Sequence, residues 1–225
     1  IQGRKYFLAT TFIFFILLIT LVLLQPDLGM TILISSTFFC QLFIAGLPIL
    51  LVIYGLLLIF SVSIFAYFFL DHVKNRIDSF LGNADTYQID LSLLAFKSGG
   101  ILGKGPGQGD LKEKIPDANT DFIFAVAGEE LGLIFCLIFL IIILSIVIKT
   151  LLKVLKVSNP YKIIAISGLI CSFGLQSLIN ILSALGMIPT KGMTLPFVSY
   201  GGSSMLATSI LFGFLLSLTN LNNNE

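Results

Sequence analysis

The chain has 225 residues, of which 56% are hydrophobic and only 11% are charged. Soluble domains carry about 25% charged residues, so this composition excludes an ordinary soluble protein and indicates a polytopic helical membrane protein. The 13 basic and 12 acidic residues nearly cancel, which gives no reason to expect nucleic-acid binding. Cys40, Cys136 and Cys171 lie inside apolar runs, so neither a disulfide nor a metal site is predicted from them.

Six apolar segments approach the length of about 20 residues that a helix needs to cross a bilayer. They are residues 6–24, 31–47, 49–70, 131–148, 163–185 and 205–218. We therefore expect an all-α polytopic protein in which residues 1–225 form a single membrane domain. Because the first span follows Ile1 almost at once, with no signal peptide before it, the chain is expected to be the later part of a longer protein.

Lysine placement predicts the orientation of these spans. Residues 149–162 contain four lysines and no acid, which is typical of a cytoplasmic loop, and Arg4 and Lys5 also belong on that side. Counting spans from either marker places residues 71–130 outside. This long extracytoplasmic loop separates the third and fourth spans, and loops of such length usually have a function.

The long loop contains three kinds of sequence. Residues 71–83 place Val73, Ile77, Phe80 and Leu81 on one helical face, which predicts a helix lying on the membrane surface. A glycine-rich run, "GGILGKGPGQGD", follows, and Pro116 is then expected to open a new helix. The glycine run lacks the Lys-Ser/Thr ending of a phosphate-binding loop, so no nucleotide cofactor is expected.

A second irregular segment, residues 186–204, joins the last two spans and is extracytoplasmic by the same count. Both irregular segments are therefore expected to meet at one membrane face, where sites between helices commonly form. Its end, "SYGGSS", combines glycines that permit close backbone approach with a helix start that favours anions such as phosphate.

Four acidic residues stand near the end of the long loop. Asp117 and Asp121 would share one face of a helix begun by Pro116, where they would repel unless a cation lay between them or one pKa were raised. Capping of the helix dipole is the favoured role for Asp117. A functional role is favoured for Asp121, since an acid at the membrane edge is costly without a partner. Structural pairing, with Lys191 or with a basic residue of the missing part of the protein, is expected for Glu129 and Glu130.

For the polar residues in and between the spans, structural roles are favoured over functional ones. In "QPDLGM", Pro26 and Gly29 fit a helix break after Gln25, and Asp27 fits an N-cap of the next helix. The fifth span carries a stripe of polar residues on one face, for which interhelical hydrogen bonding is favoured over the lining of a cavity. The stripe consists of Ser172, Gln176, Asn180 and Ser183.

Four motifs carry a family resemblance: "LLQPDLGM", "PDANTDFIFAVAGEELGL", "LQSLINI" and "PTKGMTLPFVSYGGSS". Their order and spacing resemble the FtsW/RodA/SpoVE (SEDS) family of bacterial wall synthesis, and the last motif is most similar to the division-specific branch. The resemblance implies a ten-helix peptidoglycan glycosyltransferase that polymerises lipid II into glycan strands outside the membrane. The six spans would be its last six, so the 225 residues alone are expected to be inactive.

The resemblance also implies roles for individual residues. Asp121 matches the family's essential acid and is the expected catalytic base, whereas Asp117 and Asn119 replace the usual Glu and His. The expected substrate-binding residues are Asp117, Asn119, Thr120, Lys191, Ser199 and Ser203. The expected supporting residues are Gln25, Asp27, Glu130, Gln176, Asn180, Pro196, Tyr200, Gly201 and Gly202.

The chemistry and the resemblance together suggest cofactors and partners. A leaving pyrophosphate needs positive charge, from Lys191, Lys112, Lys114 or a divalent cation such as Mg²⁺ or Mn²⁺. Lipid II, a class B penicillin-binding transpeptidase and other division proteins are the implied partners, in the bacterial cytoplasmic (inner) membrane at the septum. The alternatives are a lipid II flippase, a RodA-like polymerase of cell elongation and a non-catalytic scaffold of the division machinery.

Overall fold

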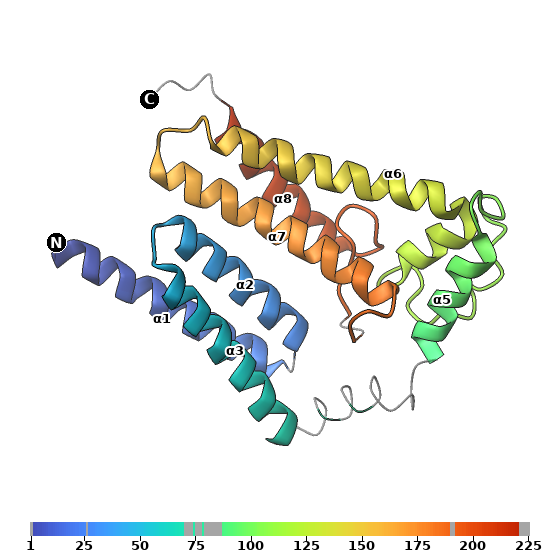
Figure 1. Ribbon diagram of the computed structural model, residues 1–225, viewed down its shortest axis with the longest axis horizontal. Coiled ribbons are helices and arrows are strands. Elements are labelled where there is room, and N and C mark those ends of the chain that lie inside the picture. The colour runs from blue at the N-terminus through green and yellow to red at the C-terminus, as the bar shows by residue number, and fades with distance from the viewer. Residues whose placement is uncertain are drawn as a thin grey trace.

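The computed structural model describes residues 2–25, 27–69, 74, 78, 87–189 and 192–220. Within these ranges the chain forms helices and turns and no strand, which confirms the all-α prediction (Figure 1). The helices are α1 (Gln2–Leu24), α2 (Leu28–Ile44), α3 (Ile49–Phe69), α5 (Tyr87–Gly99), α6 (Ile123–Val154), α7 (Pro160–Ala184) and α8 (Gly202–Thr219).

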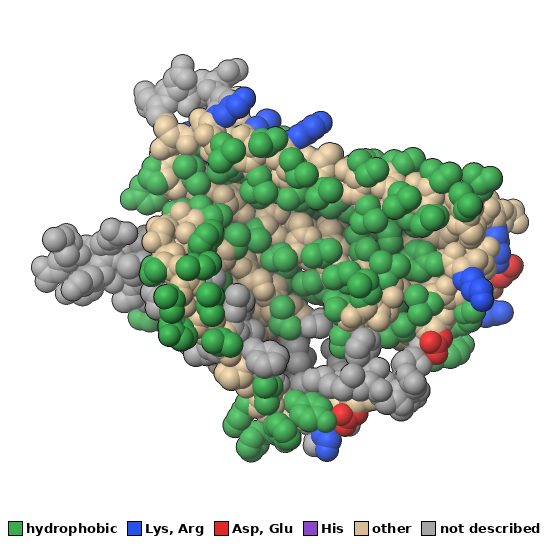
Figure 2. All heavy atoms as spheres, in the orientation of Figure 1, with side chains coloured by type: hydrophobic (Ala, Val, Ile, Leu, Met, Phe, Trp, Pro, Cys, Tyr) green, Lys and Arg blue, Asp and Glu red, His purple; other side chains and the backbone are tan. Residues whose placement is uncertain are grey.

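The six predicted spans correspond to α1, α2, α3, α6, α7 and α8. Among the described residues, α6, α7 and α8 are long and apolar enough to cross a membrane, and residues 10–24 and 29–44 form shorter apolar helices. Large hydrophobic side chains are exposed along them, as expected for helices that face lipid. In Figure 2 hydrophobic side chains cover much of the face in view, and the charged ones lie along its edges.

Two local predictions within the long loop are wrong. Pro116 does not open a helix, because Asp117 adopts a left-handed conformation with φ of 55° and residues 111–122 form turns. The fourth span begins at Ile123, eight residues before the predicted start at 131. Helix α5 was not predicted, and the predicted surface helix over residues 71–83 lies outside the described residues, apart from positions 74 and 78.

Helix packing brings the two irregular segments together at one end of the molecule, as predicted. Helix α7 contacts α2, α5, α6 and α8, and α5 packs against the beginning of α6 (Figure 1). A hydrophobic cluster fills this end and joins α5, the turn before α6, the last turns of α7 and the second irregular segment. Its most buried members include Ala95, Phe122, Ala125, Ala184 and Leu195. The turn that carries Asp121 is therefore anchored in a core through its neighbour Phe122, which is 2% exposed.

Candidate functional site

A break in α6 organises the long loop. Gly132 lies inside the helix with φ of 79°, a left-handed conformation that glycine adopts without strain. The segment after α5 inserts at this break. The amides of Lys104 and Gly105 donate to the carbonyls of Glu129 and Glu130, at 3.0 and 2.9 Å.

The second half of α6 completes the insertion. The amides of Leu133 and Ile134 donate to the carbonyls of Gly100 and Ile101, at 3.0 and 3.3 Å. A Cβ atom on Gly132 would lie 2.4 Å from the amide nitrogen of Gly103, so only glycine permits this approach. The glycine run thus has a packing role, which its density of glycines could have suggested although the partner helix could not be identified from sequence.

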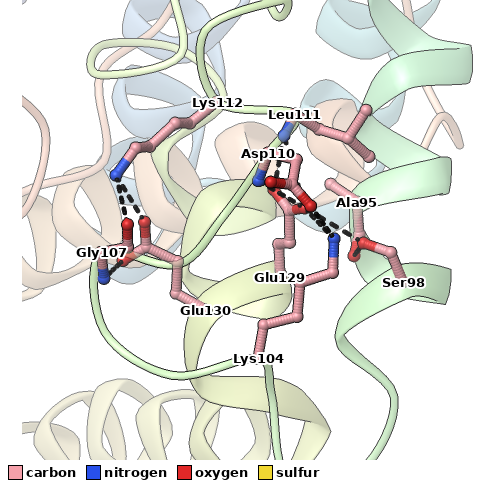
Figure 3. A network of polar contacts seen from close by, with 9 residues as sticks. All are labelled: Ala95, Ser98, Lys104, Gly107, Asp110, Leu111, Lys112, Glu129 and Glu130. Carbon is pink, nitrogen blue, oxygen red and sulfur yellow. Dashed lines mark hydrogen bonds and ion pairs between the residues drawn. The ribbon is translucent and has the colours of Figure 1, made fainter.

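The carboxylates of Glu129 and Glu130 secure the same loop (Figure 3). Glu129 is fully buried and accepts from the Lys104 ammonium at 2.8 Å and from the amides of Asp110 and Leu111, each at 3.1 Å. Glu130 accepts from Lys112 at 3.0 Å and from the Gly107 amide at 2.8 Å.

The network confirms structural pairing for both glutamates and identifies two partners among the described residues. The lysines that pair with them are Lys104, which was not singled out from sequence, and Lys112, whereas the expected partner Lys191 lies outside the described residues. Lys104 also pairs with Asp110 at 3.0 Å, and this ammonium lowers the pKa of the Asp110 carboxyl. These acids and bases therefore satisfy one another within the loop.

The turn before α6 is held by its backbone. The carbonyl of Asn119 accepts from the Tyr200 amide at 2.9 Å, and the carbonyl of Thr120 accepts from the Ser199 hydroxyl. The next carbonyl, that of Asp121, accepts from the side-chain amide of Asn180 in α7 at 2.9 Å. Three consecutive carbonyls are thus fixed from outside the turn, which sets the position of the Asp121 side chain.

The Asp121 carboxylate is half-buried, and no lysine or arginine forms an ion pair with it among the described residues. Burial is the main cause that raises the pKa of Asp121, and the charge of Asp117 raises it further, against a smaller opposing effect of the Thr120 hydroxyl. The two aspartates are therefore neighbours, as predicted, although a turn rather than a helix brings them together. A backbone bond from the Asp121 amide to the Asp117 carbonyl, at 3.0 Å, closes that turn.

Glycine also borders the Asp121 carboxylate from the second irregular segment. Gly192 has φ of 61°, and a Cβ atom placed on it would lie 3.6 Å from Asp121 Oδ2. The segment then runs through Leu195, which is 1% exposed, to the start of α8 at Gly202. No side chain of the described residues caps that helix start.

Two cavities adjoin this region, and each is lined by some of the predicted residues, whereas Asp117, Thr120 and Asp121 line neither. A groove of about 600 Å³ is lined by Asn119, Ser199, Tyr200, Gly201 and Gly202. A second cavity of about 520 Å³, between α2, α7 and α8, is lined by Gln176, Pro196 and Ser203 as well as apolar side chains. Ser199 and Ser203 thus face different cavities, and the structure does not bring all predicted substrate-binding residues together.

The polar stripe of α7 bonds to loops more than to helices. Gln176 donates to the Thr194 carbonyl at 3.0 Å, and Asn180 donates to the carbonyls of Met193 and Asp121. The expected interhelical bonding is thus replaced, for these two residues, by bonds to both irregular segments. Ser172 instead lines the cavity between α2, α7 and α8.

The residues before α2 have the predicted structural role. Asp27 is the N-cap of α2, and its carboxylate accepts from the Met30 amide at 2.9 Å. The amide of Gln25 donates to the Val22 carbonyl at 3.1 Å in the turn that ends α1. Pro26 lies outside the described residues.

Comparison with protein-family models gives a match over residues 2–224 to the FtsW/RodA/SpoVE model, described as "Cell cycle protein". The chain belongs to the FtsW/RodA/SpoVE family. Two relatives are each named "Probable peptidoglycan glycosyltransferase FtsW". The one from Caulobacter vibrioides is 43% identical over 92% of this chain and 54% of its own length. The one from Borreliella burgdorferi is 38% identical over 99% of this chain and 63% of its own length.

A solved structure supports the family fold. A chain of the structure "Structural coordination of polymerization and crosslinking by a peptidoglycan synthase complex" superposes on this chain with a TM-score of 0.71, and the two sequences are 25% identical. The match covers 92% of this chain and 60% of that one. The chain thus spans between 54% and 63% of the length of these proteins. Its membrane-length helices and its family make it a multi-pass membrane protein.

Proposed function

We propose that the protein of which these 225 residues form a part is a peptidoglycan glycosyltransferase that polymerises lipid II during septal wall synthesis. Family membership and the names of the similar proteins support the activity. The observation that carries the proposal is the position of Asp121. Its carboxylate is half-buried between two converging loops and lacks an ion pair among the described residues, while every acid of the neighbouring network has a basic partner.

Polymerisation joins a sugar hydroxyl of one molecule to a sugar held on a lipid pyrophosphate. The hydroxyl must lose its proton as it attacks, and a carboxylate with a raised pKa suits that role because general bases work best near the operating pH. Asp121 takes the proton in this proposal. The open groove beside Asn119 and Tyr200 is of a size that accepts a sugar, and it adjoins the Asp121 turn.

The leaving pyrophosphate gains negative charge and needs a cationic partner. Lys112 is occupied by Glu130 in the described loop, so Lys114 and Lys191 remain the proposed partners within this chain. No three potential metal ligands gather among the described residues. Asp117 and Asp121 supply two carboxylates, and Mg²⁺ commonly binds through one or two carboxylates together with substrate phosphates, so the pair fits a divalent cation.

The proposed setting is the cytoplasmic (inner) membrane at the division septum, with a class B penicillin-binding transpeptidase and other division proteins as partners. The structural similarity to a chain of a peptidoglycan synthase complex supports a crosslinking partner. The chain spans only 54% of the Caulobacter relative, and the 225 residues alone are therefore expected to lack polymerase activity.

The test compares wild type with Asp121→Asn in the full-length parent protein, purified with its transpeptidase and supplied with lipid II. Loss of a general base lowers the rate by about 100- to 10,000-fold, so glycan strands should nearly disappear while complex yield stays constant. Unchanged polymerisation would remove Asp121 from the chemistry. Retained lipid II transport across vesicles by both proteins, without polymer, would favour the flippase.

A further inference from the structure

The side chain of Asn180 has an unusual environment for a residue in a membrane helix. It is 1% exposed, and both hydrogens of its amide nitrogen are used, by the carbonyls of Asp121 at 2.9 Å and Met193 at 2.6 Å. Its amide oxygen is buried and has no hydrogen-bond partner among the described residues. The orientation is fixed, because a rotated amide would turn its oxygen toward two carbonyl oxygens.

The two accepting carbonyls belong to the two different irregular segments. One is that of Asp121 itself, and the other is that of Met193, which follows Gly192. Gly192 is the residue that borders the Asp121 carboxylate. One amide on the rigid helix α7 therefore fixes both the acid and the backbone that faces it.

This arrangement is not explained by packing. A buried amide oxygen without a donor is unfavourable, and an apolar side chain of similar volume would fill the same space without that cost. Such a side chain would leave the carbonyls of Asp121 and Met193 without donors. What the amide supplies, and an apolar residue does not, is the link between the two segments.

We propose that Asn180 is a positioning residue for the reaction, which holds the Asp121 carboxylate at a fixed distance from the second irregular segment. The inference rests on the proposed polymerase function and deepens it. Small displacements of a catalytic group lower the rate strongly, so loss of this link acts on turnover. Substrate affinity depends on other parts of the surface and changes less.

The chain offers two matched controls on the same helix. Ser177 is also 1% exposed, but among the described residues its hydroxyl bonds only to the Phe173 carbonyl within α7. Gln176 donates to Thr194 of the second segment, and within the described part of the chain it forms no hydrogen bond to the Asp121 turn. Ser177→Ala therefore tests burial alone, and Gln176→Ala tests loss of an anchor on one segment only.

The experiment measures polymerisation of lipid II by the full-length protein with its transpeptidase. Asn180→Ala should lower kcat by about 10- to 100-fold with KM changed by less than about threefold. Ser177→Ala should behave as wild type, and Gln176→Ala should have a smaller effect than Asn180→Ala. Equal behaviour of Asn180→Ala and Ser177→Ala would overturn the proposal, as would a loss expressed in KM alone.

The split between kcat and KM is the readout that a purely structural role would not move, because a smaller amount of folded enzyme changes neither constant once rates are expressed per folded molecule. If Asn180→Ala does not fold, Asn180→Ser is measured in its place. Its single hydroxyl hydrogen can bond to only one of the two carbonyls, so a kcat lower than that of wild type is expected. A wild-type kcat would overturn the proposal.

Asp121→Asn, measured in parallel, separates the two proposals. An active Asp121→Asn enzyme contradicts the proposed role of Asp121 and with it this inference. An inactive Asp121→Asn enzyme with normal Asn180→Ala turnover contradicts only the positioning role of Asn180.

Discussion

Two pairs of acidic residues lie within 14 positions of one another at the same end of the molecule, and they are held in opposite ways. Glu129 and Glu130 have carboxylates surrounded by lysines and backbone amides. At Asp121, in contrast, the backbone carbonyls of the turn are fixed and the carboxylate has no ion pair among the described residues. The carboxylates of Glu129 and Glu130 stabilise the loop through ion pairs, whereas the turn at Asp121 is held by its backbone and leaves the carboxylate free to react.

Breaking the network at Glu129 and Glu130 should have the largest effect on stability. Glu129→Ala removes a fully buried carboxylate with an ion pair to Lys104 and two backbone bonds. The loss leaves the amides of Asp110 and Leu111 without their acceptor, which typically costs about 1–3 kcal/mol for each donor, and the free energy of unfolding in detergent micelles should fall by that order. Glu113→Ala, at an exposed position of the same loop, should change it by less than about 0.5 kcal/mol. Equal effects of the two variants would show that the network does not stabilise the loop.

The helix break should be the next most sensitive feature. Gly132→Ala forces a side chain into a left-handed conformation and against the backbone of Gly103, which together should cost about 2–4 kcal/mol. Gly213→Ala, in α8, meets nothing within 4 Å and should be neutral or stabilising by up to about 1 kcal/mol. Thermal unfolding of both variants measures the difference. A Gly132→Ala protein as stable as Gly213→Ala would contradict the inserted loop.

The interaction between Asp117 and Asp121 can be tested through the pH dependence of kcat. Burial is the main cause that raises the pKa of Asp121, and the charge of Asp117 is the second. The proposed base therefore becomes protonated, and inactive, at a higher pH than an ordinary carboxyl would. Asp117→Asn removes the neighbouring charge, and the acid limb of kcat for polymerisation should move to lower pH. Glu113→Gln, which changes the charge at an exposed position elsewhere in the loop, is the comparison. A limb that stays in place in Asp117→Asn would mean that the two aspartates do not interact.

The smallest expected effect is that of Asp121→Asn on stability. A carboxyl whose pKa is raised by folding binds its proton more tightly in the folded state, so its ionisation disfavours folding above the folded pKa. Asn removes that penalty, and the unfolding midpoint at neutral pH should be equal or slightly higher. The difference should vanish as the pH falls through the folded pKa toward the ordinary value of 3.8. A large fall in the midpoint would instead show that the carboxylate is part of the scaffold.

The spans were predictable because hydrophobicity alone determines them, and Asp27 as a cap followed from local sequence. The start of α6 was not, because the acids and glycines of residues 123–132 look polar until α5 and the inserted segment cover them. Asp117 and Asp121 were correctly expected to be neighbours, for a wrong reason. Their turn depends on a left-handed residue and on bonds from α7 and residues 199–200, which lie 59 or more positions away.

The insertion of residues 100–105 at Gly132 also determines where the long loop tolerates insertions and deletions. Four backbone bonds align Gly100 and Ile101 with Leu133 and Ile134, and Lys104 and Gly105 with Glu129 and Glu130. Deleting one residue between positions 101 and 104 would shift one pair of bonds relative to the other. An added residue at the exposed Pro106–Gln108 stretch would leave all four in register. Homologous chains should therefore keep a constant spacing across the break and vary in length beyond it.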